Sequence, residues 1–122
     1  VYCSNPDRAS PRAGGVTVVS PGELAHRHLE AGGVVHFYGK PHLPIFQRLQ
    51  HELQMPAARI LMVGDSLEHD IAGAKQAGWA SLFVEGGLYA NNFASGERAA
   101  NLAALCAAQG REPPDFSVPL VN

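Results

Sequence analysis

Short apolar runs that alternate with stretches of helical length most constrain what this chain can fold into. The runs are rich in β-branched and aromatic side chains and lie at residues 16–19, 34–38, 60–63 and 81–84. A run that is apolar at nearly every position is typical of a strand covered on both faces, as in a parallel sheet. The intervening stretches are long enough to form crossover helices. The sequence therefore predicts an α/β fold.

Helix-starting and helix-ending residues delimit the expected helices, which span residues 21–31, 44–56, 68–77 and 95–109. Ser95 would cap the last helix, and Gly78 and Gly110 would end the last two. The side chains expected to face inward are Leu24, His28, Leu29, Ile45, Phe46, Leu49, Leu53, Ile71, Ala74 and Ala77. Residues 1–15 contain turn-forming residues instead, so they are predicted to be a loop or hairpin from a different module.

Size and charge exclude several classes of protein. The chain has 122 residues, of which 46% are hydrophobic, and this suffices for one compact domain with a core. The formal net charge is −2 and the nine Lys and Arg residues are scattered, so nucleic acid is not expected as a partner. No apolar run approaches the ~20 residues of a membrane span, and no secretion signal is recognisable. We expect a soluble, cytoplasmic protein without membrane contact.

The cysteine and histidine spacings favour neither a disulfide framework nor a zinc site. Cys3 and Cys106 lie far apart and neither belongs to a C-x-x-C motif, so two reduced and mostly buried thiols are predicted. His26 and His28 are two positions apart on an expected helix, where they would point to different faces. They make a poor pair of metal ligands.

The segment Gly64-Asp65-Ser66-Leu67-Glu68-His69-Asp70 directly follows one expected strand. Ligands bind beyond the carboxyl ends of the strands in open α/β sheets, so Asp65 would be directed into such a site. Asp70 lies about one and a half helical turns later and can return to the same loop, to hold a cation's shell or a lysine. A magnesium site is one interpretation. An equally good one is that Asp65 or Ser66 caps the helix and Asp70 is a solvated acid.

The segment Tyr38-Gly39-Lys40-Pro41 also follows an expected strand and precedes a helix. Lys40 would place a point charge where a phosphate or a cluster of carboxylates could bind. An ordinary surface lysine in a turn is the competing interpretation.

These two motifs, in this order and with one helix between them, resemble the third and fourth motifs of the haloacid-dehalogenase-like (HAD) superfamily. The segments 71–79 and 84–87 resemble that superfamily too, and Asn5-Pro6-Asp7 resembles the end of the cap domain in its class IIA branch. The resemblance implies that residues 1–35 are the tail of a C2-type cap. Residues 36–122 would be the C-terminal half of a three-layer Rossmann-like core, whose parallel sheet carries helices on both faces.

The same resemblance implies a function and a role for each site residue. Members of this type are Mg²⁺-dependent phosphatases of small phosphorylated metabolites. Lys40 would steady the phosphoryl group, and Asp65 and Asp70 would serve the metal, Asp65 as ligand and Asp70 by orienting the site. Asn5 and Asp7 would lie near the substrate, although a plain turn is an equally good interpretation of both. His69 departs from the family pattern, because relatives more often carry a small hydroxyl residue there.

The family's nucleophile is absent from this sequence. It is the first aspartate of a D-x-D pair after the first core strand, and no D-x-D occurs in the chain. The covalent route requires that residue, so the chain alone is expected to be inactive. It would be either a fragment whose partner is the missing N-terminal half of the same protein, or a truncated product without catalysis.

Two other functions compete with the phosphatase. The chain could be a noncatalytic α/β binding or interaction module that retains an acidic cation site. A receiver-like signalling domain is disfavoured, because its lysine would follow the acidic motif and here Lys40 precedes it. The missing first strand would also leave the strand at 60–63 as an open edge, which predicts self-association.

Overall fold

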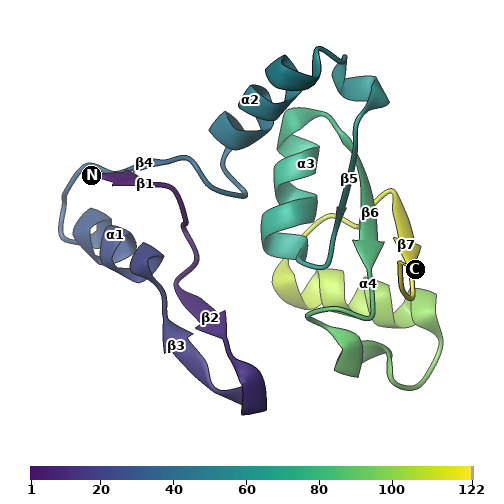
Figure 1. Ribbon diagram of the computed structural model, residues 1–122. Coiled ribbons are helices and arrows are strands. Elements are labelled where there is room, and N and C mark those ends of the chain that lie inside the picture. Colours follow the sequence, from purple (N-terminus) through teal and green to yellow (C-terminus); the bar gives the residue numbers. More distant parts are fainter. Residues whose placement is uncertain (122) are drawn as a thin grey trace.

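The computed structural model describes residues 1–121, and the predicted α/β class is confirmed (Figure 1). The strands are β1 (Tyr2–Cys3), β2 (Ala9–Pro11), β3 (Thr17–Val19), β4 (His36–Phe37), β5 (Leu61–Gly64), β6 (Ala80–Val84) and β7 (Phe116–Val118). The α-helices are α1 (Pro21–Glu30), α2 (Leu43–Leu53), α3 (Ala72–Ala77) and α4 (Arg98–Gln109). None of the described helices has the length and apolar character that crossing a membrane requires.

The described strands form three small sheets instead of one. Strands β5, β6 and β7 are parallel, β1 pairs with β4 in parallel, and β2 pairs with β3 in an antiparallel hairpin. The expectation that residues 16–19 join the main sheet is therefore wrong, and all three residues of β3 are exposed. A short apolar run does not by itself reveal which strand it pairs with. Residues 1–15 were predicted to be a loop or hairpin, and they contribute β2, whose antiparallel partner β3 lies outside that range.

One face of the three-stranded sheet carries the core of the C-terminal part. Phe83 of β6 is fully buried and packs with Leu67, Ile71, Leu105 and Cys106. The turn before α3 and helix α4 therefore cover this face (Figure 1). A second cluster joins α2 and α3 to the start of β5 and β6, and it contains Phe46, Ile60, Ala74 and Trp79. The first cluster lies next to the loops that follow β5 and β6, and the second lies at the other end of these strands. The first cluster therefore holds those loops in place.

The opposite face of this sheet is exposed among the described residues. The register places Val63 beside Leu82 and Leu82 beside Phe116, so these side chains share one face. Leu61, Val63 and Phe116 are 48%, 45% and 60% exposed. Strand β5 pairs only with β6 in the described part of the chain, so its outer edge is open. The expectation of strands covered on both faces is wrong here. We call this surface the open face.

The helix boundaries follow the predictions more closely than the helix faces do. Gly78 and Gly110 end α3 and α4 with positive φ, as predicted. In α1, however, Leu24 and Leu29 are exposed, whereas Gly22 and Ala25 are buried. In α2 only Phe46 is buried, and Ile45, Leu49 and Leu53 are exposed. An apolar stripe becomes buried only where another element packs on it, and periodicity does not show whether one does.

Two helix starts differ from the predictions. α3 begins at Ala72, because residues 67–71 form a single π-helical turn after Ser66. α4 begins at Arg98 and is capped by Glu97, whose carboxylate accepts from the amides of Ala99 and Ala100. Ser95 is not the cap. Cys3 and Cys106 are both free and buried, as predicted.

Candidate active site at the carboxyl end of β5

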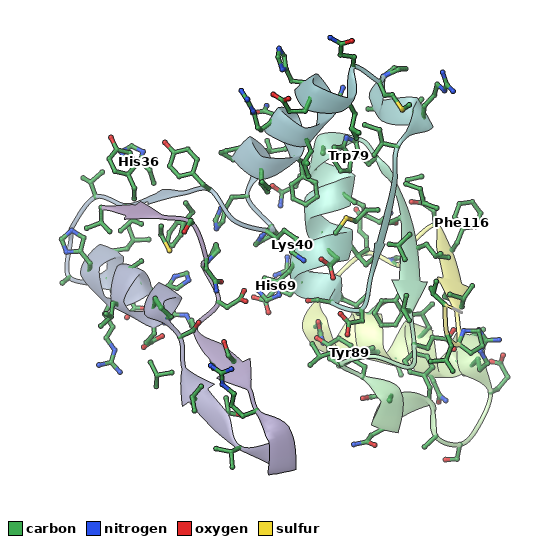
Figure 2. All side chains as sticks on the ribbon, viewed as in Figure 1. His36, Lys40, His69, Trp79, Tyr89 and Phe116 are labelled. Atoms are coloured by element: carbon green, nitrogen blue, oxygen red, sulfur yellow. The ribbon has the colours of Figure 1, made fainter. Side chains whose placement is uncertain are left out.

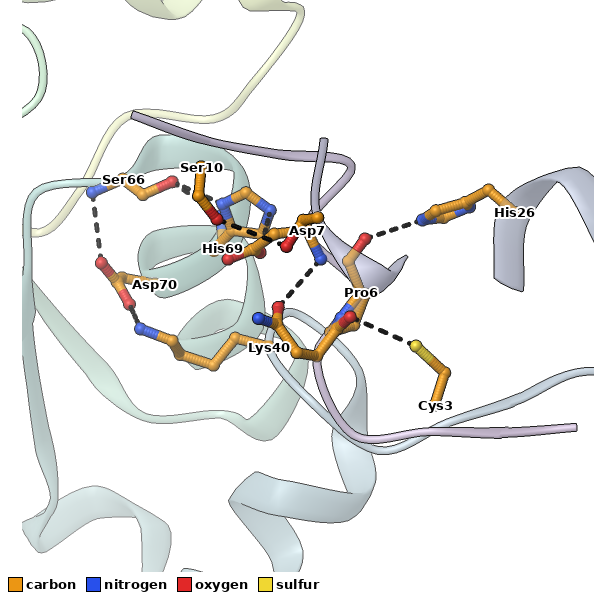
Figure 3. A network of polar contacts seen from close by, with 11 residues as sticks. Cys3, Pro6, Asp7, Ser10, His26, Lys40, Ser66, His69 and Asp70 are labelled. Atoms are coloured by element: carbon orange, nitrogen blue, oxygen red, sulfur yellow. Dashed lines mark hydrogen bonds and ion pairs between the residues drawn. The ribbon is translucent and has the colours of Figure 1, made fainter. Parts of the chain in front are cut away.

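Lys40 lies near His69, where the N-terminal part of the chain meets the turn before α3 (Figure 2), and it forms an ion pair with Asp70 (Figure 3). Lys40 Nζ lies 2.5 Å from Asp70 Oδ1, and the other carboxylate oxygen accepts from the Ser66 amide at 3.2 Å. Asp70 is only 4% exposed, whereas the Lys40 side chain is half exposed. A buried carboxylate needs such partners because loss of water is costly for a charge. Asp70 is thus not a solvated surface acid, and Lys40 is not a surface lysine without a partner.

Two glycines allow the backbone to approach this ion pair. A Cβ at Gly64, the last residue of β5, would collide with the Asp70 carboxylate. A Cβ at Gly39 would collide with the backbone oxygen of Ser4 and the ring of Pro6. Glycine is the residue that permits such close approach. The chain therefore brings Lys40 between the N-terminal segment and the loop after β5.

Ser66 is the N-cap of the turn that carries His69 and Asp70. Its hydroxyl oxygen accepts from the His69 amide at 3.1 Å, so Ser66, and not Asp65, is the cap. The His69 ring lies between two oxygens: Nδ1 is 2.9 Å from Ser66 Oγ and Nε2 is 3.3 Å from Asp7 Oδ1 (Figure 3). His69 was not among the predicted site residues. Its only signal in the sequence was its departure from the family pattern.

Asp65 is held by the loop that follows β6. Its Oδ2 accepts from the Leu88 amide at 2.9 Å. That loop starts at Glu85, which is 3% exposed and bound through both carboxylate oxygens to the Arg98 guanidinium, at 2.7 and 2.8 Å. This bidentate contact lowers the pKa of Glu85 below its ordinary value of 4.5. Glu85 therefore stays ionised and anchors the loop against Asp65.

Substitution of Gly87 by alanine is expected to displace Asp65. A Cβ at this position would collide with the Asp65 side chain, and the loop cannot yield freely because Glu85 anchors it. Overpacking of this kind costs about 1–3 kcal/mol of unfolding free energy. Urea unfolding of Gly87→Ala measures the cost. Ser95→Ala, at an exposed position in the same connection, is the control and should change stability by less than about 0.5 kcal/mol. Equal stability of both variants would contradict the close contact.

Asn5 and Asp7 lie next to Lys40. The Asn5 side-chain oxygen accepts from the Asp7 amide at 3.1 Å, so the segment is a side-chain-stabilised turn. The same turn faces a cavity of about 450 Å³, which is lined by Ser4, Asn5, Pro6, Asp7, Tyr38, Gly39, Lys40 and Ile45. The structure thus places Asn5, Asp7, Lys40 and Asp70 around one region, and Asp65 on the adjoining loop. Asn5 and Asp7 form a turn and also line the cavity.

The acids of this region match magnesium in ligand chemistry, because Mg²⁺ binds hard oxygen donors and usually keeps several waters. Asp65 is partly exposed and one of its oxygens bonds to an amide. Both oxygens of Asp70 already bond to protein donors. No cluster of three or more His, Cys, Asp or Glu side chains suited to a metal occurs within residues 1–121. Asp65 is therefore the residue best placed to serve as a ligand, and Asp70 supports the site through Lys40 and Ser66.

The chain is similar to known hydrolases. A protein-family model described as HAD-hydrolase-like matches residues 37–108, more than half of the chain. The p-nitrophenyl phosphatase from Archaeoglobus fulgidus is 25% identical with a TM-score of 0.74, over 97% of this chain and 42% of that one. A haloacid dehalogenase-like hydrolase from Brucella suis 1330 is 25% identical with a TM-score of 0.70, over 99% and 44%. No protein with a curated functional description matches.

The comparisons also show how much of such a protein is present. A thermostable phosphatase (NPPase) double mutant from Geobacillus stearothermophilus shares the fold, with 22% identity and a TM-score of 0.72 over 98% of this chain and 41% of that chain. This chain spans less than half the length of each of these solved structures. The predicted resemblance to a HAD phosphatase with an incomplete core is confirmed. The chain therefore belongs to the HAD-hydrolase-like family.

Proposed function

We propose that this chain is the phosphate-positioning and metal-binding part of a Mg²⁺-dependent phosphohydrolase that acts on a small phosphorylated metabolite. The observation that carries the proposal is the Lys40–Asp70 ion pair beside the loop of Asp65, at the carboxyl end of β5. Ligands of open α/β sheets bind at this end of the strands. A cation and a carboxylate loop at such a position suit a phosphate ester and its metal.

Each residue has a proposed role. Lys40 neutralises charge on the phosphoryl group, Asp65 holds Mg²⁺, and Asp70 orients Lys40. Asn5 and Asp7 border the space for the rest of the substrate. Mg²⁺, when bound, supplies positive charge to phosphoryl oxygens. In this proposal residues 1–35 are the end of a cap domain and residues 36–122 belong to the core.

The nucleophile in this proposal comes from another segment, the N-terminal half of the same kind of protein. The solved structures are more than twice as long as the matched region, so they contain residues that could supply it. The open edge of β5 and the open face offer the place where such a segment would complete the sheet and its second layer. Parallel sheets of this class are ordinarily covered on both faces.

Lysine substitutions test the proposal. They are made in a fusion protein in which a segment with a D-x-D pair precedes this chain. Lys40→Ala should lower Mg²⁺-dependent turnover of p-nitrophenyl phosphate by at least about 100-fold, because it removes a charge aimed at the phosphoryl group. Lys75→Ala is the matched control, since Lys75 lies outside the site, with its Nζ 3.9 Å from Asp115 Oδ1. It should leave turnover unchanged. Equal activity of both variants would refute the role of Lys40.

A noncatalytic binding module is the second candidate, and the absence of a D-x-D pair from the sequence favours it. Such a module would bind a partner or a cation without turnover. Joining the D-x-D segment discriminates between the two functions, because a binding module would gain no phosphatase activity. The phosphohydrolase proposal requires that the joined protein gains phosphatase activity.

A further inference from the structure

The Asn5–Asp7 turn is held by close contacts with its surroundings. A Cβ at Gly22 of α1 would collide with the backbone of Asn5, Pro6 and Asp7, and Gly39 packs equally close to Ser4 and Pro6. His26 Nε2 lies 2.8 Å from the Pro6 carbonyl oxygen and donates to it. An isolated surface turn needs none of these contacts. The fold therefore sets the position of this turn relative to Lys40.

His69 adds a polar contact between this turn and the loop after β5. Its ring makes two contacts, and the roles of the nitrogens follow from Asp7, because an ionised carboxylate can only accept. The Ser66 hydroxyl oxygen already accepts from the His69 amide at 3.1 Å, and its proton is free to be donated to Nδ1 at 2.9 Å. Asp7 Oδ1 lies 3.3 Å from Nε2, so in a neutral ring Nε2 is the nitrogen that carries the proton facing the carboxylate, and Nδ1 is the acceptor. The contacts thus run in one direction, from Ser66 through His69 to Asp7.

The same Ser66 is tied to the Lys40 ion pair. Its amide donates to Asp70 Oδ2, and Asp70 Oδ1 binds Lys40 (Figure 3). Asp7 and Lys40 therefore stand at the two ends of one chain of contacts. Both also line the cavity of about 450 Å³. Loss of the contact between Asp7 and His69 would allow the Asn5–Asp7 turn, which forms the cavity wall beside Lys40, to move.

We propose that His69 is a positioning residue: by donating to Asp7, it fixes the Asn5–Asp7 turn as the wall of the substrate cavity beside Lys40. The inference rests on the proposed function in taking Lys40 as the phosphate-binding residue. The wall would border the part of the ester that leaves, and its position would decide which phosphorylated molecules fit. His69 acts through Asp7 and touches no reacting atom.

The test uses the 122-residue chain itself, and its readout is the access of a reagent to Lys40. Lys40 and Lys75 are the only lysines in the sequence, so Lys75 is an internal reference. Brief treatment with acetic anhydride followed by peptide mass spectrometry gives the ratio of Lys40 to Lys75 acetylation. In His69→Asn and Asp7→Asn this ratio should rise about three- to five-fold, the population shift expected from loss of one partly exposed contact between polar groups.

Rescue and spectroscopy separate positioning from stability. His69→Gln can still donate to Asp7 from the position of Nε2 and should restore the ratio. Glu30→Gln, which breaks the exposed Arg8–Glu30 ion pair in the same part of the chain, should leave it unchanged. Nitrogen NMR of the imidazole ring should show the Nε2–H tautomer in the native chain.

Two results would overturn the proposal: an unchanged ratio in His69→Asn and Asp7→Asn, which includes equal gains at both lysines, or the Nδ1–H tautomer. None of these measurements depends on turnover. The proposal for His69 can therefore be refuted while the phosphohydrolase proposal stands. Refutation of the phosphohydrolase proposal would in turn leave the measured effect of His69 on Lys40 acetylation unchanged.

Discussion

On its own, the 122-residue chain is expected to release no measurable p-nitrophenol from p-nitrophenyl phosphate in the presence of Mg²⁺. The covalent route implied by the family needs the nucleophilic aspartate of a D-x-D pair, and the sequence contains no such pair. Lys40 and Asp65 can stabilise charge but cannot attack phosphorus. Uncatalysed hydrolysis of phosphate monoesters is among the slowest reactions known, so charge stabilisation alone leaves no measurable rate.

A colorimetric assay decides this prediction. The chain is assayed alone and after addition of a separate segment that carries the D-x-D pair. Turnover is expected only in the mixture, and Asp65→Asn should remove it again because the Mg²⁺ ligand is lost. Rapid turnover by the chain alone that disappears in Lys40→Ala would contradict the prediction. It would require a nucleophile within residues 1–122.

The second large effect expected is self-association through β5 and the open face. The outer edge of β5 has no partner among the described residues, and Leu61, Val63 and Phe116 are about half exposed on the adjoining face. An open edge flanked by apolar side chains is a template for pairing with another chain. Size exclusion with light scattering should show dimers or larger species that increase with concentration.

Charged substitutions identify the surface responsible. Leu61→Lys with Val63→Lys should weaken association by at least about tenfold, since each half-exposed side chain can still gain about half of the 1.5–3 kcal/mol of full burial, and 1.4 kcal/mol is tenfold in affinity. Leu24→Lys is the control, because Leu24 is 70% exposed but lies on α1, away from the sheet. A freely soluble monomer at high concentration would show that the edge is protected. Equal loss in the control would show that another surface associates.

Local chemistry determined much of the framework from sequence. Gly78 and Gly110 end their helices because glycine adopts the positive φ that a C-terminal cap requires. The four apolar runs all contain strands, as their β-branched and aromatic side chains predict. The position of Asp70 after a strand also predicts a cation or a lysine as its partner, and Lys40 is that partner.

Only the tertiary structure decided which of these elements meet. Strand β3 pairs with β2 and not with the main sheet, Leu24 is exposed on α1, and the open face leaves Leu61 and Val63 exposed. The open edge of β5 was expected, but only from the family resemblance. The contact of His69 with Asp7 is of the same kind, since the two residues are distant in sequence. Periodicity reports which side chains of an element are apolar, but burial and pairing depend on a second element. Which elements pack together is decided only in the folded chain, and the Asp7–His69 contact forms only when the N-terminal turn packs against the loop after β5.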